Sequence, residues 1–113
     1  MTESEAAAES VIERLYFAVE HLATGPGDAR QRLQVVALTL APLQAREFPI
    51  EVREDYKWVW SQLTRFPPQW DGQSEIEATM KRIRKSTGSK IAERIWLIYG
   101  RVQKIRGHPE PFE

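Results

Sequence analysis

Apolar positions in the first part of the chain recur with the period of a helix. Between about residues 4 and 23 they fall within an arc of about 100° on a helical wheel, which is the width of a core-facing stripe. The members of this stripe are Ala8, Val11, Ile12, Leu15, Ala18, Val19 and Leu22. Gly25 can adopt the left-handed conformation that ends many helices, and Pro26 cannot continue a helix. We therefore expect an amphipathic helix that stops at Gly25.

The next stretch, about 29–46, is apolar on more than one side. Asp28 before it is a natural N-cap. One face of the stretch carries Leu33, Val36, Ala37, Leu40 and Gln44. Val35 and Leu38 lie elsewhere on the wheel, so we expect a central helix that touches several neighbours. Pro42 falls inside the stretch and predicts a kink near Leu38, because proline removes one backbone hydrogen bond.

A third helix is predicted over about 50–66. Its apolar stripe follows helical spacing and consists of Val52, Tyr56, Val59, Trp60 and Leu63. This pattern directs Trp60 toward the core and Trp58 roughly to the opposite side. A pair of prolines then ends the helix. The following loop, about 67–73, contains an Asp-Gly pair that is typical of a tight turn.

The last helix is predicted over about 75–106. Ser74 and Glu77 form a capping box at its start. Two successive apolar stripes follow, made of Ile76, Met80, Ile83 and Thr87, and then of Ile91, Ile95, Ile98, Val102 and Ile105. The stripe rotates near Gly88, as it does at a stutter. Either one long helix bends at Gly88, which we favour, or two helices meet there with Ser89 as a new N-cap.

Every predicted element is helical, and the chain has no internal repeat. We therefore expect an all-α fold, a four-helix bundle with a long C-terminal helix that is bent or broken near Gly88. A length of 113 residues suits a single domain. Its expected limits are 1–106, followed by a short tail over 107–113.

Composition removes several classes of protein from consideration. The chain has no cysteine, which excludes a disulfide framework, a thiolate metal site and a cysteine nucleophile. No apolar run approaches the roughly 18 residues of a membrane span, so we expect no membrane partner. The N-terminal residues are acidic and do not resemble a secretory signal. A cytoplasmic location fits these features.

The formal net charge of zero hides an uneven distribution. Residues 1–24 carry five glutamates against one arginine, a balance of −4. Residues 75–107 carry nine lysines or arginines against three glutamates, a balance of +6. Lys81, Arg82 and Lys85 are expected on one face of the last helix. This basic patch is a solvated face, a surface that pairs with the acidic first helix, or a site for an acidic protein or nucleic acid.

Four aromatic side chains lie away from the predicted core stripes or in a loop. They are Phe17, Trp58, Trp70 and Trp96. Aromatic residues that gather among polar neighbours often anchor protein interfaces. The alternative is a second small cluster, in which Trp58 packs on Pro67, Pro68 or Trp70. We therefore consider the four a candidate partner-binding surface, formed with another protein or with a second copy of this chain.

Enzymatic sites are only weakly indicated. Six residues separate Arg14 from His21, and six separate Arg101 from His108. This spacing resembles the Arg-x4-6-His signature of HEPN ribonucleases, which are also small helical bundles. The residue after each arginine is apolar here, whereas it is usually polar in that family. The segment "KSTGSK" lacks the spacing of a phosphate-binding loop. No Glu-x-x-His pair suggests a di-metal site, so we expect no metal and no cofactor.

Three segments together resemble a group of short, uncharacterised bacterial helical proteins. They are "LATGPGDARQRL", "EFPIEVREDY" and "MKRIRKSTGSKIAERIWLIY", and the resemblance covers about 15–106. It implies a bacterial cytosolic origin and no particular mechanism. The sequence as a whole predicts a non-enzymatic helical interaction module that binds a protein partner or itself. The alternatives are a nucleic-acid-associated protein that uses the basic last helix, and a HEPN-like ribonuclease.

Overall fold

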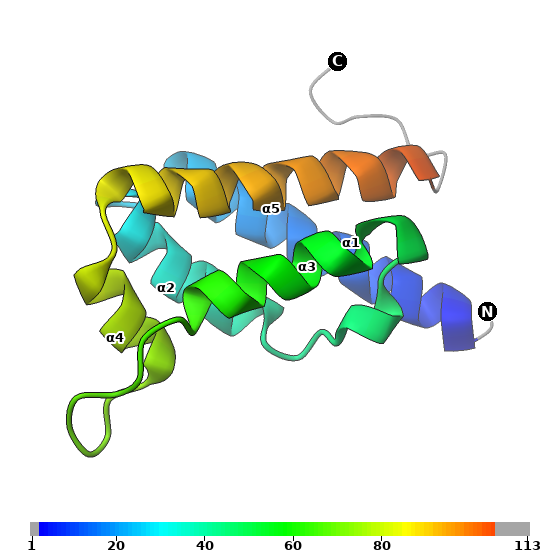
Figure 1. Cartoon of the computed structure of the whole chain (residues 1–113). Helices are drawn as coiled ribbons and strands as arrows, with labels where there is room; N and C mark the ends of the chain where they lie inside the picture. Colours follow the sequence, from blue (N-terminus) through cyan, green and yellow to red (C-terminus); the bar gives the residue numbers. More distant parts are fainter. Residues whose placement is uncertain (1–2, 106–113) are drawn as a thin grey trace.

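The computed structural model describes residues 3–105, and their side chains from residue 9 onward. Within this range the chain forms α-helices and one short 3-10 helix, which confirms the all-α prediction. In chain order the elements are α1 (Glu3–Thr24), α2 (Ala29–Leu40), η1 (Ala45–Glu47), α3 (Ile50–Leu63), α4 (Glu75–Arg82) and α5 (Lys85–Ile105). Figure 1 shows α3 and α5 side by side and antiparallel, with α1 and α2 behind them.

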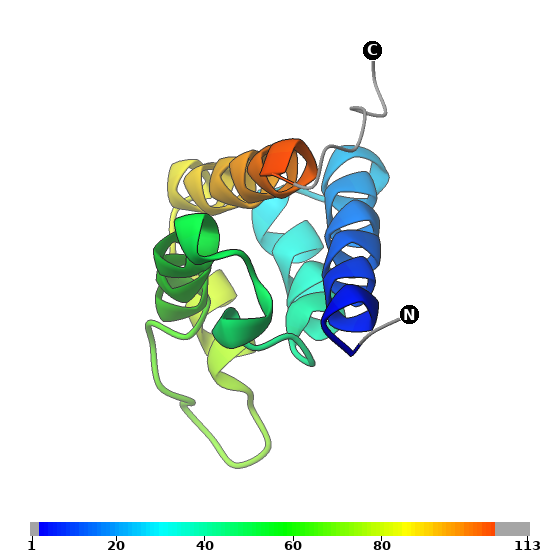
Figure 2. The same cartoon turned by 90° about the vertical axis from the view of Figure 1, so that its right-hand side faces the viewer.

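The predicted apolar stripes meet in one core. Its largest fully buried aliphatic side chains are Val11, Leu15, Leu33, Val36, Leu40, Val52, Val59, Leu63, Ile91, Ile95 and Ile98. Burying each of them stabilises the fold by about 1.5–3 kcal/mol. In Figure 2, α5 lies above α3 and beside the upper end of α1, and it contacts α1, α2 and α3. The long last helix therefore packs against helices from both halves of the chain, and α4 adds a further contact with α2.

The connection between α1 and α2 differs from the prediction at one glycine. Gly25 does not adopt the left-handed conformation, and Gly27 does, with a φ of 80°. The Gly25 amide still continues the helical pattern by donating to the His21 carbonyl at 2.7 Å. A Cβ at Gly25 would lie 2.7 Å from the His21 side chain, so the glycine is needed for space. Asp28 caps α2 as predicted and forms a capping box with Gln31.

The predicted kink at Pro42 was wrong, because α2 ends at Leu40. Pro42 has no N–H to donate to the carbonyl four residues earlier, and its ring crowds that turn. A short turn and η1 follow in place of further α-helix. The hydroxyl of Tyr56 on α3 donates to the carbonyls of Leu40 and Leu43, at 3.0 and 2.8 Å. The Leu40 carbonyl also accepts from the Leu43 amide at 2.9 Å, so the Tyr56 hydroxyl supplements this backbone bond and supplies a donor to the Leu43 carbonyl.

The prediction of one bent C-terminal helix was also wrong. The chain breaks at Ile83 and Arg84, between α4 and α5, and Ile83 has an extended ψ of 156°. Gly88 lies inside α5, where an added Cβ would come 3.0 Å from the side chain of Arg30 on α2. The same arginine donates to the Ile83 carbonyl at 3.1 Å. The small residue at Gly88 therefore marks a close helix contact, while the break itself is held by Arg30.

The loop between α3 and α4 projects from one end of the molecule (Figure 1). Helix α3 ends at Leu63, earlier than predicted, and the Thr64 hydroxyl donates to the Trp60 carbonyl at 2.7 Å. Gly72 at the tip of the loop has a φ of 89°, as expected for a tight Asp-Gly turn. The loop is tied to α4 where the amide of Phe66 donates to the Thr79 hydroxyl at 2.9 Å.

Candidate functional site

Trp58 belongs to the contact between α3 and α5. It is partly buried against the core, and the guanidinium of Arg94 lies 4.4 Å from the centre of its ring. Arg94 in turn donates to Asp55 on α3 at 3.0 Å, and Arg101 donates to the other oxygen of the same carboxylate at 3.4 Å. One aspartate of α3 therefore joins two arginines of α5. This environment gives Trp58 a role in packing two helices together.

Phe17 and Trp96 are both about half exposed, at 51% and 47%. They are connected through two tyrosines. The ring of Tyr16 lies 5.9 Å from that of Phe17 and 6.5 Å from that of Tyr99, and the ring of Trp96 lies 6.3 Å from that of Tyr99. Of the four predicted aromatics, the structure thus brings these two into one aromatic cluster across α1 and α5.

An apolar groove of about 280 Å³ lies between α1 and α5 beside this cluster. We call it the α1–α5 groove, and it is lined by Tyr16, Val19, Glu20, Ala23, Thr24 and Trp96. Tyr99 is buried next to it and accepts a hydrogen bond from Gln103 at 2.7 Å. Burial raises the pKa of the Tyr99 hydroxyl, so this side chain is neutral over the physiological range.

The acidic surface of α1 is not neutralised by the basic helices. Glu9, Glu13 and Glu20 are exposed. Among the side chains that the structure describes, no ion pair joins α1 to α4 or α5. The pairing considered from the sequence, acidic first helix with basic last helix, is therefore absent from the described part. The groove instead has one carboxylate at its α1 side, that of Glu20, which forms no ion pair among the described side chains.

The predicted basic patch is divided by the helix break. Lys81 and Arg82 lie in the last turn of α4, whereas Lys85 begins α5, so they do not share one helix face. Lys81 pairs with Glu77 at 3.1 Å, and its amine lies 4.9 Å above the ring of Trp70. Trp70 is 55% exposed. The loop tryptophan and the basic patch, which the sequence treated separately, are thus neighbours.

Phe66 extends this arrangement. Two guanidiniums lie near its ring, with Arg65 at 5.6 Å and Arg82 at 5.5 Å from the ring centre. We call the surface around it the basic–aromatic end, and define it by Arg65, Phe66, Trp70, Lys81, Arg82, Arg84 and Lys85. It runs from the projecting loop along α4 to the start of α5, which follows the end of α4 that lies away from the loop (Figure 1).

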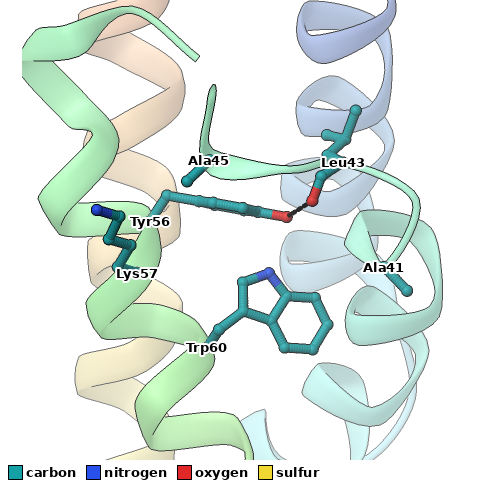
Figure 3. Close-up of a pocket in the computed structure, with 6 residues that line it drawn as sticks. All are labelled: Ala41, Leu43, Ala45, Tyr56, Lys57 and Trp60. Carbon is teal, nitrogen blue, oxygen red and sulfur yellow. Dashed lines mark hydrogen bonds between the residues drawn. The ribbon is translucent and has the colours of Figure 1, made fainter. Parts of the chain in front are cut away.

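A second depression, of about 490 Å³, lies between α3 and the segment that follows α2. Figure 3 shows its six lining residues, Ala41, Leu43, Ala45, Tyr56, Lys57 and Trp60. The Tyr56 hydroxyl points to the Leu43 carbonyl, which removes it from any chemistry with a ligand. Burial raises the pKa of this hydroxyl to about 12. Lys57 is the only charged residue of the lining, so the depression lacks an acid–base pair.

The residues proposed for ribonuclease chemistry have other contacts. Arg14 donates to the carbonyl of Thr39 at 3.1 Å, and Arg101 is engaged by Asp55. His21 lies beside Gly25 at the end of α1. His108 lies outside the described residues. In residues 3–105 no cluster of histidine and carboxylate side chains is arranged to hold a metal ion.

Some of the site residues were missed by sequence reasoning. Tyr16, Glu20 and Ala23 share one face of α1 at helical spacing, next to the core stripe, and this signal was available. Tyr99 was hidden because it lies beside Ile98 in an apolar run. The link from Asp55 to the arginines of α5 depends on which helices are neighbours, and no local pattern reveals that.

Comparison with protein families, with curated proteins and with solved structures finds no match for this chain. None of the helices in residues 3–105 is long and apolar enough to cross a bilayer.

Proposed function

We propose that this chain is a non-enzymatic helical interaction module that docks an amphipathic helix of a partner protein in the α1–α5 groove. The observation that carries the proposal is the groove itself, an apolar hollow with a half-exposed tryptophan at its edge. Tryptophan and tyrosine are the residues that most often dominate the binding energy of an interface. Here Trp96 and Tyr16 are both placed to contact an inserted side chain.

The chemistry of the groove suggests what the partner presents. An apolar lining of this size fits one or two aliphatic side chains, as when a helix lies in a groove with anchors at i and i+3 or i+4. The exposed Glu20 lines it on α1, so a helix with lysine or arginine beside its apolar anchors is favoured. The proposed partner is therefore basic and amphipathic.

The proposal extends to the scaffold and its setting. We propose that α1, α2, α3 and α5 act as a four-helix bundle, to which α4 and the projecting loop are attached. Their shared apolar core supports this view. A bacterial cytoplasm is the setting that the sequence resemblance and the lack of cysteine favour.

A site-specific photo-crosslink tests the docking surface. A benzoylphenylalanine is placed at Ala23, which lines the groove, and separately at Leu97, which is 49% exposed on α5 but outside the lining. We expect the Ala23 position to capture a protein through a basic amphipathic helix, mapped by mass spectrometry, and the Leu97 position not to capture it. Capture of the same proteins at both positions would contradict the proposal.

Two further variants test whether Trp96 anchors the partner, and sedimentation then distinguishes a partner protein from a second copy of this chain. Trp96→Ala should abolish the crosslink at Ala23, while Leu97→Ala, a substitution of equal exposure on the same helix, should leave it unchanged. The truncation of one anchoring tryptophan costs about 2 kcal/mol or more at an interface hot spot. A crosslink between two copies of this chain, together with a dimer in sedimentation, would replace the partner protein with a second copy.

A further inference from the structure

The basic–aromatic end is a second surface, built from other elements than the groove. We propose that it binds single-stranded nucleic acid, with a base stacked on Trp70 and phosphates held by Arg82, Arg84 and Lys85. This inference does not depend on the proposed docking of a protein at α1 and α5. It concerns the loop of residues 64–74, α4 and the start of α5.

Basic residues outnumber acidic ones at this end: the loop, α4 and the start of α5 carry Arg65, Lys81, Arg82, Arg84 and Lys85 against Asp71, Glu75 and Glu77. Residues 81–90 contain five lysines or arginines and no acidic residue. Within the described part of the chain, Lys81 is the only one of these five with an ion pair. Arg84 and Lys85 are exposed where the chain turns from α4 into α5. A polyanion can therefore approach without displacing existing carboxylate partners.

The helix break sets the geometry of these cations. Arg30 donates to the Ile83 carbonyl at 3.1 Å, and Asp28 holds the same guanidinium at 2.8 Å. This anchor from α2 keeps Arg82 and Lys85 on two different helices. A continuous helix would have placed them in one row along its axis. The observed turn instead distributes the positive charge around a corner of the molecule.

Aromatic rings lie among the cations. Phe66 has Arg65 and Arg82 near its ring, and Trp70 carries the Lys81 amine above its ring while more than half of its surface stays exposed. Proteins that bind single strands combine these two elements, a positively charged groove for the backbone and rings on which bases stack. Trp70 in the projecting loop is the ring most accessible for stacking.

Other polyanions fit this surface less well. Paired bases in a duplex are already stacked on each other, so they have no free face for Trp70. Recognition of a duplex commonly inserts a helix into the major groove, whereas the cations of α4 lie in the last turn of an eight-residue helix. An acidic peptide would use the cations but has no base to stack on the tryptophan.

Fluorescence anisotropy with defined polymers tests the proposal. The probes are labelled oligothymidine of about 20 nucleotides, a duplex of equal length and polyglutamate, titrated with the full chain over a range of salt concentrations. We expect the single strand to bind most tightly, with a slope of log K against log salt of about −2 for three phosphate contacts. Equal or tighter binding of the duplex or of polyglutamate, or no binding at low salt, would overturn the proposal.

Substitutions then assign the roles of the residues. Trp70→Ala should weaken oligothymidine binding about fivefold or more at every salt concentration, and Trp70→Phe should restore most of it. Arg82→Gln should reduce the salt slope by about 0.7, whereas Arg46→Gln, an exposed arginine on η1, should not. An unchanged affinity of Trp70→Ala, with its circular dichroism intact, would overturn the stacking role.

The groove variant separates this inference from the proposed function. Trp96→Ala should bind oligothymidine as the unmodified chain does, because Trp96 lies on the α1–α5 groove. A loss of oligothymidine binding in Trp96→Ala would overturn the assignment of the single strand to the basic–aromatic end.

Discussion

Two tryptophans of this molecule lie next to a cation, and their surroundings lead to opposite roles. Trp58 is held by Arg94, whose charge is taken up by Asp55 within the contact of α3 and α5. Trp70 is paired with Lys81, whose carboxylate partner Glu77 is an exposed neighbour on the same helix. A cation beside a ring is therefore not a sign of function by itself. The position of the compensating carboxylate distinguishes a helix contact from a free surface.

The largest expected effect comes from truncating the two rings in parallel. Trp58→Ala should lower the free energy of unfolding by about 2 kcal/mol, since it removes a partly buried ring from the core edge. Trp70→Ala should change it by less than about 0.5 kcal/mol, because the ring is exposed. Urea unfolding followed by circular dichroism measures both. Equal losses in the two variants would remove the distinction between them.

A second prediction applies the same reasoning to a polar group with internal partners. Tyr56→Phe should cost about 1–2 kcal/mol, because the Leu43 carbonyl loses its hydroxyl donor and the Leu40 carbonyl keeps only the Leu43 amide. The phenyl ring keeps the stacking on Phe48 at 4.0 Å. The loss in the free energy of unfolding therefore measures the contribution of the hydroxyl alone. Unfolding in urea at neutral pH gives this value, and no loss would mean that water satisfies the carbonyls equally well.

The same hydroxyl predicts an alkaline limit to stability. The fold raises the pKa of Tyr56 from 10.0 to about 12, so the folded state favours the protonated form. The stability that comes from this shift in pKa is fully present below pH 10 and is lost as the pH rises toward 12. Urea midpoints measured across this range should fall less steeply for Tyr56→Phe than for the unmodified chain. Parallel curves would assign the alkaline loss to other groups, such as Tyr99.

The hydrogen bonds of Tyr56 and Arg30 show which features of the fold the sequence alone could predict and which it could not. The stripe of Val52, Val59 and Leu63 was readable because helical periodicity is local information. The roles of Pro42 and Gly88 were misread because each depends on a residue distant in sequence, Tyr56 in one case and Arg30 in the other. A proline allows either a kink or a stop, and only the neighbouring helix decides between them.

The sequence also failed to separate the candidate site residues, and for the same reason: their roles depend on contacts with distant residues. Trp58 and Trp70 look alike in the sequence, since both lie off the core stripes among polar neighbours. The difference between them is an arginine 36 positions after Trp58, which is placed by the packing of α5 on α3. The groove beside Trp96 likewise needs α1 and α5 as neighbours. Periodicity identifies faces of helices, but it does not identify which faces meet.

A smaller effect is expected from the carboxylates beside the two rings. Asp55→Asn should cost about 1 kcal/mol, because it leaves Arg94 and Arg101 without the charge that joins α3 to α5. Glu77→Gln should cost less than about 0.5 kcal/mol, as is usual for an exposed pair within one helix. Thermal or urea unfolding at low and high salt compares them. A larger loss in Glu77→Gln would contradict the contrast between the two regions.

The smallest effect at neutral pH is expected at Asp28, which anchors the arginine that holds the helix break. Its hydrogen bond with Arg30 lowers the pKa of the carboxyl from 3.8 to about 2, so the folded state favours the charged form. This contribution to stability is present above pH 3.8 and is lost as the pH falls toward 2. Asp28→Asn keeps a good N-cap and removes the titrating charge.

The acid limb of stability should therefore be shallower in Asp28→Asn than in the unmodified chain, because the urea midpoint of the variant is slightly lower at pH 7 and the two midpoints converge as the pH falls toward 2. Protonation of Asp28 should also affect the basic–aromatic end, because Arg30 donates to the Ile83 carbonyl at the break between α4 and α5. If the pair with Asp28 orients this arginine, acid should loosen the break before it loosens the core, and amide exchange near Arg84 should rise first. Simultaneous loss of protection at Arg84 and at Ile95 would mean that the break depends on the core and not on Arg30.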